Sequence, residues 1–291
     1  MLTTAQVILI YTFTLGSLYL LISLGFSVIC GVLRIFHMGY AYIFVVAIYV
    51  TWMFMQALGL GLIPSICAMV AVQAGIALAV YKGVIKRWPL EEEKMVVGFL
   101  LIALVIEQAA LHWYPEHVGV YLETTLVPGA MHIGPTYISN QLLFGAVIGL
   151  ALTGLFILFF TKSRMGLAAR AISQDLFTSR LMGINVERIY ILVMIISVIP
   201  VIVAMLIVAP VWVVKPGMGW DYMITAILVC VLGGLGNLRG TLMASYLIGF
   251  THSITCFALG LPRFMGLSGL VLVLIILIVR SEGLTRTEAL W

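Results

Sequence analysis

The stretch KSRMGLAARAISQDLFTSRLMGINVER, from Lys162 to Arg188, interrupts a chain that is otherwise almost entirely apolar. Five of its residues are cations and two are anions, and long apolar segments flank it on both sides. The cations are Lys162, Arg164, Arg170, Arg180 and Arg188, and the anions are Asp175 and Glu187. A polar segment of this length has to lie in water, and its excess of cations predicts the cytoplasmic side of a membrane.

The composition around this stretch excludes a soluble globular protein. The chain has 291 residues, of which 63% are hydrophobic and 9% charged, and its mean hydropathy is +1.21. Soluble domains carry about 25% charged residues. Several continuous apolar runs reach the roughly 20 residues that a helix needs to cross a bilayer, whereas the strands of a membrane barrel alternate apolar and polar residues. The sequence therefore predicts an all-α polytopic membrane protein.

Nine apolar segments are predicted to cross the membrane, within a single transmembrane domain over residues 1–291. They cover residues 7–33, 38–58, 62–81, 95–113, 138–160, 189–213, 219–233, 241–259 and 264–280. The first follows no basic region and is expected to be a retained span rather than a cleaved signal. The short segment 219–233 meets the next at a glycine-rich stretch, so a broken or re-entrant helix near 233–240 would leave eight crossings.

The positive charges predict which side is inside. With nine spans and a cytoplasmic C-terminus, thirteen of the 15 Lys and Arg residues lie on the inner side, which leaves Lys215 and Arg263 outside. This bias predicts an N-terminus outside, a cytoplasmic loop 162–188 and a multi-pass protein of the cell inner membrane. The loop 114–137 holds no Lys or Arg but three prolines, which predicts an irregular extracytoplasmic cap.

Within the cytoplasmic loop, residues 166–183 are predicted to form one short helix. At 100° per residue, the side chains of this helix divide into a mainly polar arc and an opposite face that suits the membrane-embedded body. The arc holds Arg170, Ser173, Gln174, Phe177 and Arg180, and the opposite face holds Ala168, Ile172, Leu176, Ser179 and Gly183. Phe177 is surrounded by polar side chains and is predicted to anchor the binding of another protein, because a buried aromatic side chain can dominate an interface. A helix that rests in the lipid headgroups is the alternative.

Three motifs resemble the branched-chain amino acid (Liv-type) permeases of ATP-binding cassette importers. They are Gly166-x-x-x-Arg170-Ala171-x-x-x-Asp175 with Arg180-Leu-x-Gly183-Ile184-Asn185, then Pro216-x-Met218-Gly219 with Val231-Leu-Gly233-Gly234-Leu-Gly236-Asn237-Leu-Arg239-Gly240, and Leu24-Gly25 to Gly39. In that family the loop helix sits in a groove of a separate ATPase subunit. The resemblance therefore implies ATPase coupling for Gly166, Arg170, Ala171, Ser173, Gln174, Asp175, Phe177, Arg180, Gly183, Ile184 and Asn185.

Two departures from the family pattern stand out. Leu176 to Ser179 replace a Pro-Glu pair and two alanines that commonly follow in the loop, and the run Ile35 to Tyr40 lacks the polar neighbours that often surround the first signature. Docking details and the solute therefore do not carry over directly from the family.

Seven residues are predicted to lie on a solute path. They are His37, Gly39, Glu107, Gly233, Gly234, Gly236 and Asn237. Glu107 is an acid in an apolar segment, so it requires a partner or a water-filled cavity, unless it lies near the outer interface. The glycines suit a broken helix that exposes backbone groups to solute, and a plain tight turn is the alternative.

The resemblance implies a permease subunit that imports branched-chain or other hydrophobic amino acids by alternating access. Its expected partners are a second, homologous permease chain in a heterodimer, two ATPase subunits, a periplasmic or surface solute-binding protein and membrane lipid, with no nucleic acid. No cofactor is expected in this chain, since ATP and Mg belong to the ATPase subunits. Neither an enzymatic site nor a metal site is predicted, because phosphate-loop motifs and short Cys/His spacings do not occur. Import of urea or short amides, and a stand-alone carrier or channel coupled through Glu107, remain alternatives.

Overall fold

A computed structural model describes residues 2–88, 91–113, 119–133, 136–280 and 283–284. Parts of the predicted outer loop 114–137 and of the C-terminal tail lie outside this description. The described residues form eleven α-helices, a β-hairpin and three short irregular helical turns. The helices are α1 (Leu2–Leu33), α2 (Tyr40–Ala57), α3 (Leu62–Val80), α4 (Glu92–Trp113), α5 (Asn140–Lys162), α6 (Arg164–Gln174), α7 (Leu176–Leu181), α8 (Val186–Val208), α9 (Met218–Gly233), α10 (Leu238–Ser253) and α11 (Met265–Val279). The turns are η1 (Tyr81–Ile85), η2 (Ile254–Ala258) and η3 (Pro262–Phe264), and the strands are β1 (Ala130–Ile133) and β2 (Thr136–Ser139).

Eight helical segments of the described chain are long and apolar enough to cross a membrane, which confirms the polytopic all-α class. The ninth predicted crossing is α9, whose 16 residues extend about 24 Å, short of the roughly 30 Å of a bilayer core. The helix that corresponds to the predicted span 189–213 starts and ends earlier in the chain than predicted. Asn185 caps the helix earlier, and α8 ends at Val208, two residues before Pro210. A proline disfavours further helical turns, although α8 accommodates Pro200 in its interior.

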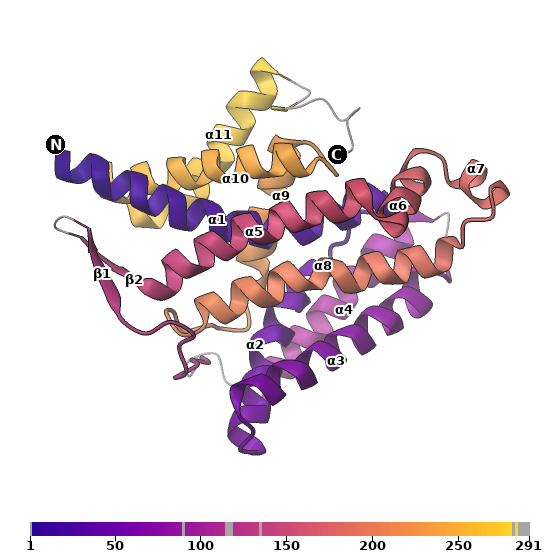
Figure 1. Ribbon diagram of the computed structural model, residues 1–291, viewed down its shortest axis with the longest axis horizontal. Helices are drawn as coiled ribbons and strands as arrows, with labels where there is room; N and C mark the ends of the chain where they lie inside the picture. The colour runs from indigo at the N-terminus through magenta and orange to yellow at the C-terminus, as the bar shows by residue number, and fades with distance from the viewer. Residues whose placement is uncertain (1, 89–90, 114–118, 134–135, 281–282, 285–291) are drawn as a thin grey trace.

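The long helix α1 is the centre of the molecule, with α10, α8, α5 and α9 packed around it (Figure 1). It runs antiparallel to α10, and hydrogen bonds between side chains tie the two helices together along their length. Ser27 meets Thr241 at 3.0 Å, Ser17 meets Tyr246 at 2.6 Å, and the Tyr19 hydroxyl lies 2.8 Å from His252 Nδ1. Because water is absent from a bilayer core, these polar groups have to be satisfied between helices.

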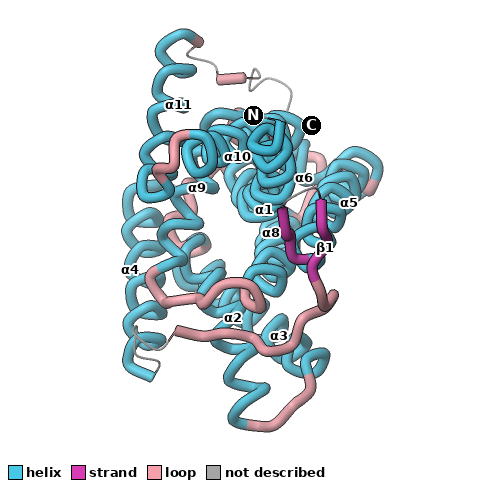
Figure 2. The backbone as a smooth tube through the Cα atoms, turned by 90° about the vertical axis from the view of Figure 1, so that its left-hand side faces the viewer, coloured by secondary structure: helices cyan, strands magenta, loops and turns pink. Residues whose placement is uncertain are grey.

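Helices α2, α3 and α4 form a second group, which lies on the other side of α8 and α9 when viewed from the hairpin end (Figure 2). Gln73 Nε2 of α3 donates to the Ile43 carbonyl of α2 at 2.8 Å, and the Tyr40 hydroxyl joins α2 to the Ile22 carbonyl of α1 at 2.9 Å. The two groups therefore share one continuous buried core.

The two ends of the molecule differ. The start of α1 and the β1–β2 hairpin lie at one end, and α6 and α7 lie at the other (Figure 1). The expectation of an irregular outer cap was wrong for 130–139, where Ala130↔Ser139 to Ile133↔Thr136 pair antiparallel. Val120 also pairs with Val214, so the segment before the hairpin is bound to the α8–α9 connection through its backbone.

Candidate coupling surface and solute path

Helix α6 is fixed against the body of the protein by its first turn. Ser163 caps it, because its Oγ accepts a hydrogen bond from Gly166 N at 2.9 Å. Gly166 lies so close to α5 that a Cβ there would stand 2.5 Å from Phe160 Cα. Ala169 and Ile172 are buried on the same side. Gly166 therefore serves the attachment of the coupling loop and presents no surface to a partner.

The single helix predicted over 166–183 is in fact two helices, with a break at Asp175. This residue has extended backbone angles, and its Oδ1 accepts from Phe177 N at 2.9 Å and Thr178 N at 3.1 Å, while the Thr178 hydroxyl donates to Oδ2. The Thr178 hydroxyl and these backbone donors hold the pKa of the Asp175 carboxyl below its usual value. An aspartate followed by Leu-Phe-Thr is a typical N-cap, a signal that the sequence offered.

Three apolar side chains on and just after α7 face away from the protein. Phe177, Leu181 and Met182 are 72%, 71% and 79% exposed, and together they are called the α7 patch below. Phe177 was predicted on the outward arc, and it is exposed. Leu181 and Met182 were missed, because the break at Asp175 turns α7 away from the direction that one continuous helix would give it.

The other predicted coupling residues divide between surface and interior. Gln174, Asp175, Arg180, Gly183 and Asn185 are exposed, Arg170, Ala171 and Ile184 are half-buried, and Gly166 and Ser173 are buried. The outward position predicted for Ser173 was wrong, since its hydroxyl turns back to the Arg170 carbonyl at 2.7 Å. Arg170 itself reaches inward, and its Nη2 donates to the Thr161 carbonyl at 3.3 Å. Gly183 has a φ of +80°, which favours glycine there.

His37 and Gly39 lie together where the chain turns from α1 into α2. The His37 ring stacks on Phe99 of α4 with centroids 4.3 Å apart, and a Cβ on Gly39 would stand 2.9 Å from His37 Cε1. Both ring nitrogens are buried without a hydrogen-bond partner among the described residues. Burial lowers the pKa of His37 to about 4, so its imidazole is neutral at pH 7.

Glu107 has a partner from α9. Its Oε2 accepts a 2.6 Å hydrogen bond from the Trp220 indole, so α4 is joined to the first turn of α9. Glu107 follows Phe99 by eight residues, about 12 Å along α4. Because of this separation, the carboxylate does not belong to the His37 cluster.

The glycine-rich break is a tight, buried turn between α9 and α10. Gly234 and Gly236 have φ of +92° and +81°, and a Cβ on Gly233 would stand 2.5 Å from the Gly240 carbonyl carbon. Asn237 caps α10, because its Oδ1 accepts from Gly240 N at 3.0 Å. Packing therefore accounts for these glycines, and the predicted solute-path residues fall in three places: the start of α2, the start of α9 and its far end.

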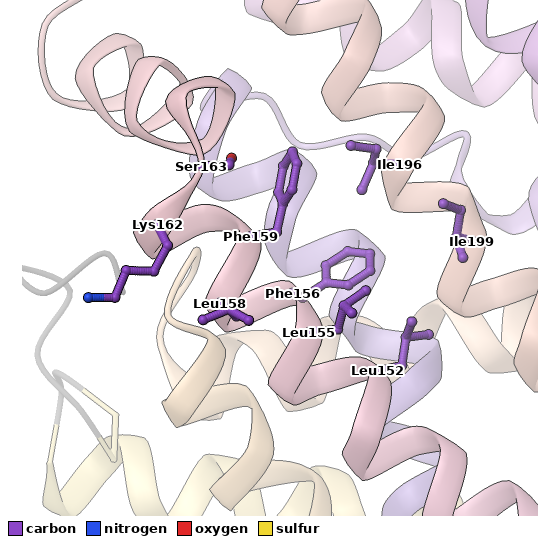
Figure 3. A pocket seen from close by; sticks show the side chains of 9 residues that line it. All are labelled: Leu152, Leu155, Phe156, Leu158, Phe159, Lys162, Ser163, Ile196 and Ile199. Atoms are coloured by element: carbon purple, nitrogen blue, oxygen red, sulfur yellow. The ribbon is translucent and has the colours of Figure 1, made fainter.

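An apolar groove of about 530 Å³ lies between α5 and α8 (Figure 3). Phe156, Phe159 and Ile196 contribute to its lining, and Lys162 and Ser163 lie at the end near α6. A site for a polar solute needs convergent polar groups, which this groove lacks over most of its length. Its lining instead suits the acyl chains of membrane lipid.

The chain matches the family described as "Branched-chain amino acid transport system / permease component" over residues 8–279. It belongs to this family.

Permeases of known name resemble it along nearly their whole length. The high-affinity branched-chain amino acid transport system permease protein BraD of Pseudomonas aeruginosa is 24% identical over 93% of this chain and 92% of its own. The LivH proteins of Salmonella typhimurium and Escherichia coli K12 are 25% identical over 94% of each chain. Among solved structures, PsaBC from Streptococcus pneumoniae in complex with Fab superposes with a TM-score of 0.51 over 96% of this chain and 91% of that one. At 16% identity it shows a shared fold only.

This permease carries site features that sequence reasoning missed. The Trp220 partner of Glu107 depends on how distant segments pack. The exposure of Leu181 and Met182 depends on the break at Asp175, and Arg34, described below, has an unusual local backbone angle. Among the described residues no group of three or more His, Cys, Asp and Glu side chains could hold a metal ion.

Proposed function

We propose that this permease is the membrane-spanning subunit of an ATP-binding cassette importer, and that α7 is the point at which a separate ATPase subunit acts on it. The α7 patch carries this proposal. Three large apolar side chains on one short polar loop are costly to expose to water, and an exposed patch of this kind marks an interaction surface. ATP and Mg bind to the ATPase subunits in this arrangement, and this chain supplies no catalytic group.

The proposed cargo is a branched-chain or other hydrophobic amino acid. The named relatives support this assignment, because they are branched-chain amino acid permeases that align over more than nine-tenths of this chain. A second permease chain, homologous to this one, is proposed to complete the path. Movement of α6 and α7 by the ATPase pair would shift the permease between outward- and inward-open states.

The proposed orientation in the inner membrane places the α6–α7 end in the cytoplasm and the N-terminus outside. The excess of Lys and Arg in 162–188 supports it. The hairpin end then faces the solute-binding protein. The described hairpin-end segments 119–133 and 136–139 contain no Lys or Arg, which agrees with an extracytoplasmic surface.

Co-purification and uptake test this function together. The permease expressed together with ATPase subunits from the same organism should retain them in detergent. The reconstituted complex should take up labelled leucine only with ATP and the binding protein. Uptake that needs an ion gradient and no ATP, by a permease that retains no ATPase, would contradict the proposal and favour a stand-alone carrier.

A further inference from the structure

A second cavity, of about 630 Å³, opens at the α6–α7 end of the molecule. Its walls come from the end of α1, from η1, from the start of α4, from α7 and from the start of α8. The lining residues that matter below are Arg34, Glu92, Arg180 and Glu187, with Leu176 on α7. The volume falls in the range of small-molecule sites. Unlike the groove between α5 and α8, this cavity combines polar and apolar walls.

The charges around the cavity have both signs. Lys86 Nζ and Glu187 Oε1 form an ion pair at 2.8 Å, which ties η1 to α8. Arg34 and Arg180 line the same cavity, and neither pairs with a carboxylate among the described residues. Glu92 faces it as well, without a cation partner in that part of the chain. The cavity therefore presents two free cations and one free anion.

Arg34 is held in an unusual backbone conformation. Its φ is +53°, and within the described residues every other residue with positive φ is glycine. A side-chain-bearing residue is disfavoured in this left-handed region, and such conformations cluster at functional sites. At this position the chain turns out of α1. The left-handed backbone conformation that the turn requires would cost less for glycine than for arginine.

The remaining lining is mostly apolar, with the phenol groups of Tyr81 and Tyr190 among it. Four buried apolar side chains, called the apolar floor below, line the cavity: Ile35, Ile85, Met95 and Val186. An aliphatic side chain placed on them would leave water. Cations, anions and an apolar floor within one cavity match a molecule that carries a carboxylate, an ammonium group and an aliphatic side chain.

We propose that this cavity binds the imported hydrophobic amino acid from the cytoplasm and thereby inhibits further import. The carboxylate lies between Arg34 and Arg180, the ammonium group faces Glu92, and the aliphatic side chain rests on the apolar floor. The identity of the ligand rests on the proposed function. Since Leu176 and Arg180 belong to α7, a bound amino acid ties α7 to α1 and α4 and opposes its movement.

The test uses the complete transporter in proteoliposomes, with ATP and increasing leucine inside and binding protein with labelled leucine outside. Initial uptake should fall as internal leucine rises. Arg34→Gly removes the guanidinium and keeps the backbone conformation, which glycine adopts readily. In this variant, uptake with no internal leucine should equal that of the unmodified complex, and the internal leucine needed for half-inhibition should rise about tenfold or more.

Two further comparisons sharpen the test. Lys82→Ala removes an exposed cation of η1 that does not line the cavity, and it should leave inhibition unchanged. Internal leucinamide, which lacks the carboxylate, should inhibit far less than leucine. Inhibition of Arg34→Gly equal to that of the unmodified complex, equal inhibition by leucinamide, or inhibition that follows the anionic phospholipid content would overturn the cavity assignment alone. Absence of ATP-driven leucine uptake with an empty interior would contradict the proposed function and, with it, the ligand.

Discussion

Gly31 of α1 and Gly236 of the α9–α10 turn meet backbone to backbone, since a Cβ on Gly31 would stand 2.5 Å from Gly236 Cα. Gly31→Ala should therefore push the turn away from α1. Overpacking of this kind costs about 1–3 kcal/mol, and the neighbouring atoms here are backbone that cannot rotate aside. We expect a lower thermal unfolding temperature for the detergent-solubilised permease.

Gly75→Ala in α3 is the matched control, because a Cβ there meets nothing within 4 Å. Alanine at an open helical position is favoured over glycine by about 0.5–1 kcal/mol. The control should keep or raise the unfolding temperature. Equal losses in both variants would show that the contact between α1 and the turn is not tight.

The spans were predictable because a bilayer imposes one strong requirement, a continuous apolar helix of sufficient length. On this ground the sequence predicted all eight membrane-length helices of the described chain. It also indicated that the segment corresponding to α9 is short. The break at Asp175 and the β1–β2 hairpin were not predicted. Both lie outside the membrane-length helices, where local capping and pairing compete on nearly equal terms with other conformations.

The candidate site was predictable in part for a similar reason. Phe177 stood out as an aromatic in a polar loop, which is a local feature. The contact of Glu107 with Trp220 joins residues 113 positions apart, and the cavity gathers side chains from five elements. Such groupings follow from helix packing, which no periodicity of the sequence encodes.

Phe177→Ala should weaken binding of the ATPase subunit and leave membrane insertion intact. Its side chain is exposed and contributes little to the fold, so the loss should appear in the complex. Truncation of an aromatic anchor commonly costs about 2 kcal/mol or more of binding energy, which corresponds to a roughly 30-fold weaker complex. Titration of purified ATPase onto permease in nanodiscs measures it.

Tyr137→Ala is the control for this variant, since Tyr137 is an aromatic of similar exposure at the hairpin end. It should bind ATPase with unchanged affinity. If Phe177→Ala also binds normally, α7 is not the docking surface, and a helix resting on lipid headgroups accounts for the loop.

Asp175→Ala should loosen α7 without affecting α6. The carboxylate accepts hydrogen bonds from Phe177 N and Thr178 N, and loss of this N-cap leaves both amides without a partner at the start of α7. Amide hydrogen exchange of residues 176–182 should become faster, and ATPase affinity should fall. Asp175→Asn keeps an accepting oxygen and should retain most of the protection. If the amides of Asp175→Ala exchange at the unmodified rate, the cap does not stabilise α7.

The cap should also respond to acid. The pKa of Asp175 is lowered in the folded protein, so the charged carboxylate is the stabilising form. Its contribution is present above the ordinary carboxyl pKa of about 4 and is lost as the pH falls below it. Amide exchange in α7, corrected for intrinsic rates, should therefore be constant from neutral pH down to about 5, and Asp175→Asn should remove the dependence at lower pH.

Substitutions of Glu107 distinguish a positioning role of this residue from a role in ion coupling. In the proposed function its carboxylate holds the first turn of α9 through the Trp220 indole, so the essential property is an accepting oxygen rather than a charge. Glu107→Leu leaves a half-buried donor unpaired, which costs about 1–3 kcal/mol, and ATP-driven uptake should fall several-fold. Glu107→Gln keeps an oxygen within reach of the indole and should retain most of the uptake. A carrier coupled to protons or sodium through this acid would lose transport in both variants, so a large loss in Glu107→Gln would contradict the positioning role.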